Sequence, residues 1–421
     1  MNRVRPLLLV LGILFASVVL AEFALRVLRP VSLQYYYDLK RLHAYHPDYL
    51  VALAPNEDRV IKHHQDLWTG RFTTNSLGYR GSKDPDDRPV LACLGDSLVM
   101  GFGVSDEDTF CAQLDGSVLG GKNHQAMNLG VDAFGSVGFQ KRLTEAADKL
   151  KLSTVLLFVS PNDFTMPPEL EKRGVKSDDV IDQERRDNPE LLKYFRIQFE
   201  LTRFSYLLHA SKLSSEQLIL EAKTRRNSIR TNLIRAGIVA PGPEETTRSE
   251  GFGRYIANQF YSFPPHKTCE PTSVSSWSCP EPIPEYIKGS CQDKPPLASD
   301  LAPLPAITQE SYLKMIELSK EKKFKLIPIF LPVQVEELYC GMHGKSHPLH
   351  DYAVRAAAFF ARHNVPTVDM NTHIKDICGL PTPKISDQVI PGDGHLTVSG
   401  NNWAARAIQA ELKRMDLNRA F

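Results

Sequence analysis

Several patterns that would assign a function at once are missing from the sequence. Charge of neither sign is in excess, since 50 Lys and Arg against 49 Asp and Glu leave a net charge of +1. This balance, without any basic block, argues against a protein that mainly binds nucleic acid. The seven cysteines form no CxxC pair, which argues against a zinc ribbon. No P-loop or dinucleotide fingerprint is present, so we expect no nucleotide cofactor.

Glycine and proline are not abundant either, and the chain contains no internal repeat. With 25 Gly and 29 Pro in 421 residues, collagen-like and low-complexity architectures are excluded. Apolar residues make up 42% of the chain, which is enough to bury a core. At roughly 150 residues per domain, the length predicts two or three domains, or one large domain with an insertion.

The amino terminus carries an apolar run. Residues 6–21 are uncharged and follow Arg3 and Arg5. As a helix they span about 24 Å, and extension to Leu25 reaches about 30 Å, the thickness of a bilayer core, with Glu22 near the far interface. We predict an uncleaved anchor within residues 1–30, because a signal-peptide core has only about 7–15 residues; a signal peptide cleaved after Ala21 is the alternative.

Whether the segment is an anchor or a signal peptide, the rest of the chain is exported. The positive residues keep the amino terminus in the cytoplasm. We therefore expect a single-pass protein of the cytoplasmic membrane whose bulk is extracytoplasmic, on the periplasmic side. Cysteine usage fits this route, since a Pro- and Ser-rich stretch holds three cysteines that a disulfide would stabilise: Cys269, Cys279 and Cys291. Cys340 and Cys378 are candidates for a further pair, and Cys93 is expected to be a small core residue.

Short apolar segments alternate with helical patterns. The expected strands are residues 89–95, 125–130, 153–160, 325–333 and 365–370. The expected helices are residues 139–151, 311–322, 352–363 and a closing amphipathic helix around 403–412. Short apolar strands that alternate with helices predict a parallel sheet covered on both faces. The expected fold class is α/β, a three-layer α/β/α, doubly wound, flavodoxin-like domain with a mainly parallel five-stranded sheet.

The pattern also predicts an interrupted domain. Residues 31–84 are interpreted as a stem between the transmembrane helix and the first strand. Residues 85–165 and 307–421 supply the two halves of the α/β domain. Residues 166–306, rich in charge and proline, form a large, partly helical insertion.

Each candidate motif follows a strand, and ligands bind at the carboxyl ends of strands in such sheets. Gly95–Leu98 offers Ser97 on a tight turn, where its own N–H can face an oxyanion; an N-cap serine is the alternative. Gly130 and Asn162 follow the next two strands and would add two N–H donors, if they are not ordinary turn residues.

A base is available near the last helix. Asp393-Gly394-His395 places a carboxylate and an imidazole on one loop. A histidine can accept the serine proton near neutral pH, and a carboxylate fixes its tautomer and stabilises its charged form.

The order of these motifs resembles the GDSL, or SGNH, hydrolase superfamily. Gly95-Asp96-Ser97-Leu98, Asn128-Leu129-Gly130, Asn162-Asp163 and Asp393-Gly394-His395-Leu396 match its four blocks. The resemblance implies Ser97 as nucleophile, His395 as base and Asp393 as its orienting acid. It also implies an oxyanion hole from the Ser97 N–H, the Gly130 N–H and the Asn162 side chain, on a three-layer α/β/α fold.

Two departures refine the resemblance, which covers residues 85–165 and 311–415. Ser160 stands where the third block usually begins with glycine. The carboxylate lies two rather than three residues before the histidine, as in the branch that contains polysaccharide O-acetyltransferases such as those acting on alginate. Residues 75–81 resemble a stretch that precedes the first block in membrane-anchored bacterial members.

These features favour an extracytoplasmic serine esterase that cleaves an acyl ester, an O-acetyl group on a carbohydrate or a lipid ester, through a Ser97 acyl-enzyme. An O-acyltransferase that acetylates a cell-envelope polysaccharide is the alternative, because both share the first half-reaction. A non-catalytic protein that binds a glycan or a partner on the same fold is the alternative from another class.

Other polar residues receive structural interpretations. Asp96 and Asp163 are expected to support their loops. Several histidines are expected to be solvated loop residues rather than metal ligands: His63, His64, His343, His347 and His350.

Overall fold

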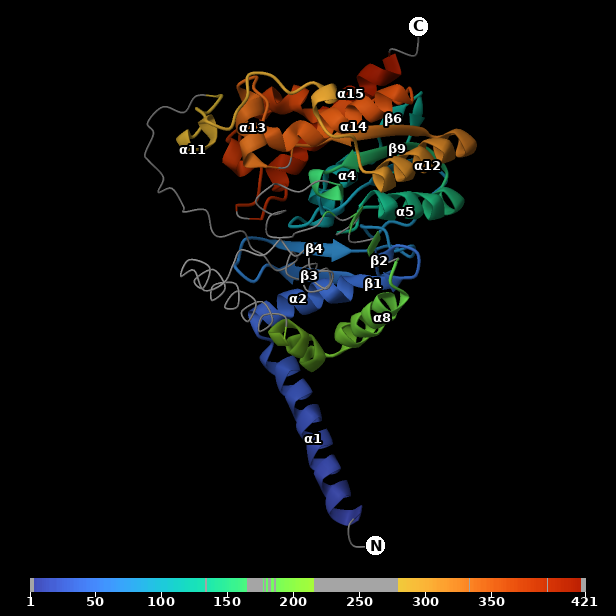
Figure 1. The fold of residues 1–421 in the computed structure, drawn as a ribbon, viewed down its shortest axis with the longest axis vertical. Helices are drawn as coiled ribbons and strands as arrows, with labels where there is room; N and C mark the ends of the chain where they lie inside the picture. The colour runs from blue at the N-terminus through green and yellow to red at the C-terminus, as the bar shows by residue number, and fades with distance from the viewer. Residues whose placement is uncertain are drawn as a thin grey trace, which may run out of the picture. The chain divides into compact units, whose positions relative to one another are not determined.

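The computed structural model describes residues 4–132, 135–164, 177, 179–180, 183–184, 187–215, 279–332, 334–391 and 393–417 (Figure 1). The chain divides into two compact units. The helical unit comprises Met1–Tyr45 and Arg185–Tyr261, and the sheet unit comprises His46–Glu184 and Ser262–Phe421. The expected insertion therefore contributes to both units.

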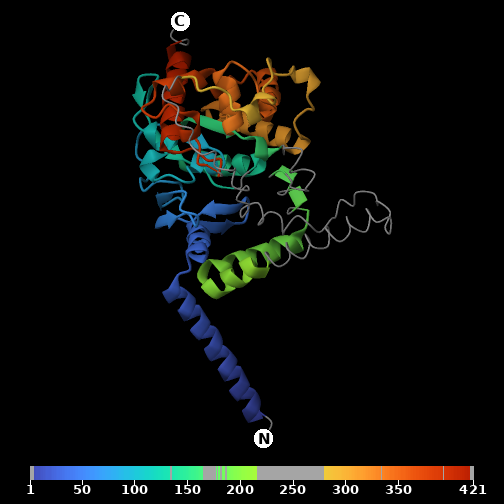
Figure 2. The ribbon, with the colours of Figure 1, turned by 90° about the vertical axis from the view of Figure 1, so that its left-hand side faces the viewer.

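The helical unit contains α1 (Val4–Leu28), α2 (Val31–Leu42) and α8 (Pro189–Phe204). Figures 1 and 2 draw α1 as one continuous helix. Its segment Leu8–Leu28 is long and apolar enough to cross a membrane, a test that a signal sequence also passes. A small core joins α2 to the chain after α8, where Tyr37 stacks on Tyr206 with ring centroids 3.8 Å apart.

The sheet unit is α/β and is built on a five-stranded parallel sheet, as predicted. Its strands, in chain order, are β5 (Val90–Leu94), β8 (Gln125–Asn128), β9 (Leu152–Val159), β10 (Lys325–Phe330) and β11 (Val368–Asp369). Their order across the sheet is β11-β10-β9-β5-β8, so β5, the first of the five in the chain, lies between β8 and β9. Every residue of β5 is buried, which explains its unbroken apolar sequence.

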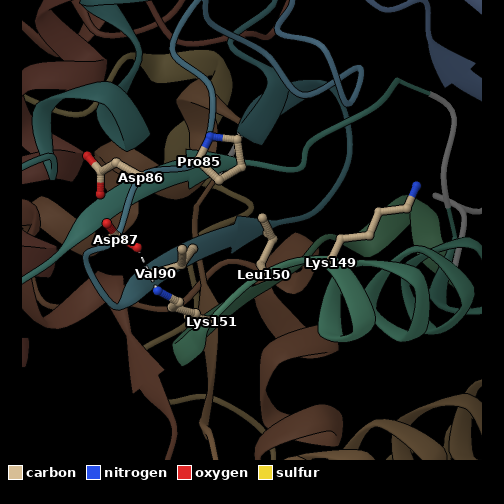
Figure 3. Close-up of a pocket in the computed structure, with 7 residues that line it drawn as sticks. All are labelled: Pro85, Asp86, Asp87, Val90, Lys149, Leu150 and Lys151. Atoms are coloured by element: carbon tan, nitrogen blue, oxygen red, sulfur yellow. Dashed lines mark hydrogen bonds and ion pairs between the residues drawn. The ribbon is translucent and has the colours of Figure 1, made fainter.

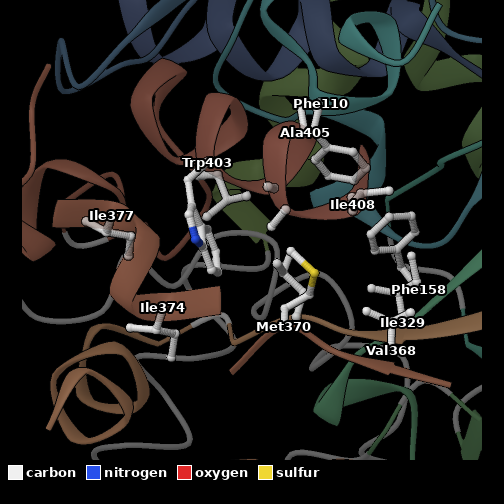
Figure 4. Close-up of a cluster of buried hydrophobic side chains, with 14 of the residues drawn as sticks. Phe110, Phe158, Ile329, Val368, Met370, Ile374, Ile377, Trp403, Ala405 and Ile408 are labelled. Atoms are coloured by element: carbon white, nitrogen blue, oxygen red, sulfur yellow. The ribbon is translucent and has the colours of Figure 1, made fainter. Parts of the chain in front are cut away.

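Helices cover both faces of this sheet. On one face, alternate residues such as Leu91 and Phe158 pack with Trp403 in a cluster shared with α4, α13, α15 and η5 (Figure 4). The other face meets α5, α12 and α14. There, the ring centroids of Phe330 in β10 and Tyr352 in α14 lie 6.4 Å apart. The ring centroids of Tyr312 in α12 and Phe360 in α14 lie 5.0 Å apart.

The covering helices are α4 (Phe110–Gln113), α5 (Ser136–Lys149), α12 (Ala306–Lys322), α13 (Val335–Met342), α14 (Asp351–Arg362), α15 (Val398–Leu417) and the 3₁₀ segment η5 (Met370–Gly379). The four helices expected from periodicity are thus present as α5, α12, α14 and α15. Short elements complete the description: α3 (Ser97–Met100), α11 (Glu285–Lys288), β6 (Val118–Leu119), β7 (Lys122–Asn123), η1 (Asp106–Asp108), η2 (Pro161–Asp163), η3 (Ala298–Asp300), η4 (Pro348–His350) and η6 (Ile385–Asp387).

The stretch interpreted as a stem is rich in regular structure. Beyond α2 it holds β1 (His43–His46), β2 (Leu50–Leu53), β3 (Asp58–Lys62) and β4 (Thr69–Thr73). β3 and β4 form an antiparallel hairpin within the sheet unit. An isolated antiparallel bridge joins Arg80, after the hairpin, to Asn128 at the end of β8.

Three cysteine pairs stand at disulfide distance. They are Cys93–Cys111, Cys279–Cys378 and Cys291–Cys340, with Cα–Cα distances of 6.1, 5.7 and 5.4 Å. The suggested pairing of Cys340 with Cys378 is therefore wrong, and Cys93 is more than a small core residue. Chain spacing could not reveal these partners, because each pair joins segments that meet only in the fold. Cys269 lies outside the described residues.

Candidate active site

Ser97 lies directly after the central strand β5, as the first residue of α3. The turn into α3 requires glycine at position 95, since a Cβ there would lie 2.4 Å from Val99 Cγ2. Asp96 caps the helix, because its Oδ1 accepts a hydrogen bond of 2.9 Å from the Leu98 N–H. Asp96 is thus the structural residue that was expected. The alternative role of Ser97 as the N-cap is wrong.

The fold brings His395 and Asp393 to Ser97. The His395 Nε2 lies 2.7 Å from the Ser97 Oγ, across a sequence separation of 298 residues. On the other side of the ring, Nδ1 is hydrogen-bonded to Asp393 Oδ1. Gly394, between them, has a φ of +88°, a conformation that a glycine adopts without strain and that lets both side chains leave one short loop.

The two charged groups shift each other's protonation. Burial lowers the pKa of His395, but the charge of Asp393 and the hydrogen bond to it outweigh burial and raise this pKa above its ordinary value. Burial likewise raises the pKa of Asp393, but the His395 charge and hydrogen bond, with a smaller contribution from Trp68, leave it lowered. Asp393 is therefore ionised at neutral pH and favours a protonated His395.

Two aromatic residues complete this environment. The Trp68 Nε1–H donates to Asp393 Oδ2 over 3.3 Å. The Phe102 ring lies 4.9 Å from the His395 ring and 5.1 Å from Trp68, which meets it edge-on. Neither residue was predicted from the sequence, because Trp68 stands in the turn between β3 and β4, in the stretch interpreted as a stem. No spacing links it to the last loop.

Gly130 is required by packing against α3. A Cβ at this position would lie 2.2 Å from the Met100 backbone nitrogen. Its N–H donates to Asn128 Oδ1 over 2.9 Å, and Asn128 Nδ2 in turn donates to the Val99 carbonyl over 2.7 Å. The Ser97 N–H makes no hydrogen bond within the part of the chain that the structure describes. The contributions of both N–H groups to an oxyanion hole stay predictions.

The third block follows β9 as η2. Asp163 Oδ2 accepts a hydrogen bond of 3.0 Å from the Ser160 N–H, so Asp163 supports its loop as expected. Ser160 is buried. The Asn162 side chain lies outside the described residues, and its predicted role as a donor is not tested.

Arg80 fastens the loop that follows Ser97. Its side chain is only 1% exposed and forms an ion pair with Asp106. The same guanidinium donates to the carbonyl oxygens of Met100 and Val104, over 3.1 and 2.8 Å. Its backbone N–H donates to the Asn128 carbonyl over 3.0 Å. Arg80 therefore holds the end of α3 and the loop after it in place.

The expectation of solvated histidines is wrong at several positions. His63, His347 and His350 are buried. His350 lies between Glu337 Oε2 at 3.0 Å and Asp369 Oδ1 at 3.1 Å. Burial lowers its pKa, but these two partners outweigh burial and raise the pKa to about 9. The described residues contain no cluster of three or more potential ligands that could hold a metal ion.

A surface pocket lies elsewhere on the sheet unit. It has a volume of about 390 Å³ and is lined by residues at the amino ends of β5 and β9, including Val90 and Lys151 (Figure 3). Ser97 follows the carboxyl end of β5, so this pocket lies at the opposite end of the strand. The hydrogen-bonded set around Ser97 is the stronger candidate site.

Comparison with models of protein families gives no match for this chain, and neither does a search of curated proteins.

Proposed function

We propose that this chain is a serine esterase of the SGNH type, which cleaves an acyl ester of a carbohydrate or a lipid through a Ser97 acyl-enzyme. The observation that carries the proposal is the hydrogen-bonded series from Ser97 Oγ through His395 to Asp393. A nucleophile that contacts a base, which in turn contacts an orienting carboxylate, is the arrangement that nucleophilic acyl transfer needs.

The first half-reaction forms the acyl-enzyme. Ser97 Oγ attacks the ester carbonyl while its proton passes to His395 Nε2. Asp393 stabilises the resulting imidazolium, and the Ser97 N–H donates to the oxyanion. The tetrahedral intermediate then collapses, the ester C–O bond breaks, and the leaving alcohol takes the proton from His395.

The second half-reaction releases the acyl group. His395 removes a proton from water, and the hydroxide attacks the acyl-enzyme carbonyl. Collapse of the second intermediate breaks the bond to Ser97 Oγ, which recovers its proton from His395, and the carboxylic acid leaves. If a sugar hydroxyl replaced water here, the same residues would transfer the acyl group.

The topology supports the finer fold assignment. Numbered in chain order, the strands lie as 2-1-3-4-5, and this is the flavodoxin-like order of doubly wound sheets. The order reverses between β5 and β9, and Ser97 follows β5 at this switch point, where ligands bind in such sheets. The charge- and proline-rich residues 166–306 would be an insertion into this domain.

The proposed location is the extracytoplasmic side of the cytoplasmic membrane, with α1 as a single-pass anchor. The length and apolar character of Leu8–Leu28 support the anchor. The three cysteine pairs support an oxidising compartment.

A fluorophosphonate probe on the full-length protein in detergent tests the nucleophile. We expect one label, on Ser97, that disappears in Ser97→Ala and falls sharply in His395→Ala. Ser76→Ala is the matched control, because Ser76 is an exposed serine whose loss should leave labelling unchanged. Absence of label on folded protein would favour the glycan- or partner-binding alternative.

The acceptor is tested separately, with an acetylated glycan or an activated acetyl ester as donor. An esterase releases acetate whether or not a polysaccharide acceptor is present. Transfer of the acetyl group to an added polysaccharide, at the expense of acetate, would assign the O-acyltransferase activity instead.

A further inference from the structure

An exposed apolar stripe runs along the helical unit. Ile197, Leu201 and Phe204 of α8 are 51%, 53% and 52% exposed, and Leu208, just beyond the helix, is 44% exposed. Spacings of four and three residues align Ile197, Leu201 and Phe204 along one side of α8, and Leu208 lies in the helical stretch that follows the non-helical Ser205. No part of the chain that the structure describes covers these four side chains.

The stripe is separate from the face that α8 uses for folding. Phe195 and Phe199 are only 5% and 3% exposed, and Lys40 of α2 lies 3.2 Å from the centre of the Phe199 ring. The helix thus has one apolar face inside its unit and a second one outside. Because exposing large apolar side chains to water is unfavourable, we expect the outer apolar face of α8 to contact an apolar environment.

The end of the stripe is attached to α1. Glu22 accepts hydrogen bonds from the Ser205 hydroxyl at 2.8 Å, the Tyr206 N–H at 3.1 Å and the Leu207 N–H at 2.8 Å. Arg26 pairs with Glu22 at 2.7 Å and donates to the Phe204 carbonyl over 2.7 Å. The residues that bind Glu22 are therefore those that lie between Phe204 and Leu208.

This attachment fixes the level of the stripe relative to a bilayer. If the apolar run fills a hydrocarbon core of about 30 Å, Glu22 stands near its outer interface. A carboxylate tolerates this position when it is paired and hydrogen-bonded, as Glu22 is. Phe204 and Leu208 must then lie at the same level. α8 runs across the end of α1 rather than along it, which keeps the stripe near that level (Figures 1 and 2).

Charged neighbours fit the same environment. Lys193 and Arg196 are exposed on α8 beside the stripe. Arg41 and Arg203 lie over the Phe204 ring, at 5.1 and 5.4 Å from its centre. Basic side chains beside an apolar stripe are typical of helices that lie in the membrane interface.

We propose that Ile197, Leu201, Phe204 and Leu208 insert into the boundary between lipid headgroups and acyl chains, so that α8 is a second membrane contact beside α1. The proposal rests on the proposed role of α1 as an uncleaved anchor. The observations favour a bilayer over a protein as the partner of the stripe, because the stripe begins beside Glu22, at the end of α1 that we place at the outer membrane interface.

Lipid photolabelling of the full-length protein tests this contact. The protein is reconstituted into vesicles of phosphatidylethanolamine and phosphatidylglycerol that contain a phospholipid with a diazirine in its acyl chain. After irradiation, the labelled residues are located by mass spectrometry. We expect label on α1 and on Ile197, Leu201 and Phe204, and none on Phe195 and Phe199, which are internal controls on the same helix.

A paired variant sharpens the test. Ile197→Glu with Leu201→Glu changes exposed positions only, so the unit should still fold. It should lose the label on α8 while α1 keeps its own. Label on α1 alone in the unchanged protein would overturn the proposal and leave the anchor intact. Crosslinking of α8 to a second copy would also overturn it. Absence of label from α1 would instead refute the anchor.

Discussion

Replacing Arg80 with methionine tests whether the loop after Ser97 is held by a buried charge. The variant keeps the length of the apolar stem but removes the guanidinium. Asp106 then loses its ion pair, and the carbonyl oxygens of Met100, Val104 and Arg71 lose their donor. Removing one partner of a buried pair costs about 3–5 kcal/mol. Because Asp106 is 17% exposed and still accepts from Thr73, we expect the lower end, about 3 kcal/mol.

For a unit of about 300 residues, such a loss lowers the melting temperature by roughly 5 °C. Thermal unfolding of the full-length protein, followed by circular dichroism, measures it. Arg71→Met is the matched control, because Arg71 pairs with Asp58 on the surface, where the two side chains are 60% and 58% exposed. The control should melt as the unchanged protein does. Equal shifts for both variants, or no shift for Arg80→Met, would refute the reasoning.

Three further predictions concern the site and its surroundings. Trp68→Phe keeps an aromatic ring at this position but removes the N–H that donates to Asp393. Because this hydrogen bond is long but reaches a charged group, we expect kcat/KM to fall about fivefold, without a matching rise in KM. Because the pKa of His395 is raised and its neutral form is the base, kcat/KM should rise with pH through an inflection above 6.5. Asp393→Asn should move this inflection downward, because it removes the largest contribution that raises the pKa of His395, and an unmoved inflection would contradict this. The pKa of His350 is raised to about 9, so its ion pairs stabilise the fold fully below the unfolded-state pKa near 6.5, and this stabilisation is lost as pH rises through 9. Urea unfolding should show that the free energy of unfolding falls by about 3 kcal/mol over this range. A free energy that does not change with pH would count against the buried ion pairs.

The sheet could be predicted because its signal is local. β5 and most of β9 are short apolar runs, because strands that are buried on both faces have few polar residues. β5 and β9 therefore lie within a residue or two of the expected positions. The helices were recognisable for the related reason that an amphipathic face repeats along one segment.

The candidate site was only partly accessible to the same reasoning. Ser97 and His395 stand out because a turn after a strand and a loop before a helix mark them in the sequence. Trp68 and Arg80 carry no such mark, since their importance arises from contacts with loops far away in the chain. The burial of His350 was missed for the same reason, because its two carboxylate partners lie on other elements.

Mass spectrometry of the intact protein after mixing with p-nitrophenyl acetate and rapid acid quenching tests the central claim most directly. The account predicts a species that carries one acetyl group, on Ser97, during turnover. This species should be absent from Ser97→Ala and strongly reduced in His395→Ala. Turnover without any acetylated protein, or acetylation of a different residue that persists in Ser97→Ala, would contradict a Ser97 acyl-enzyme.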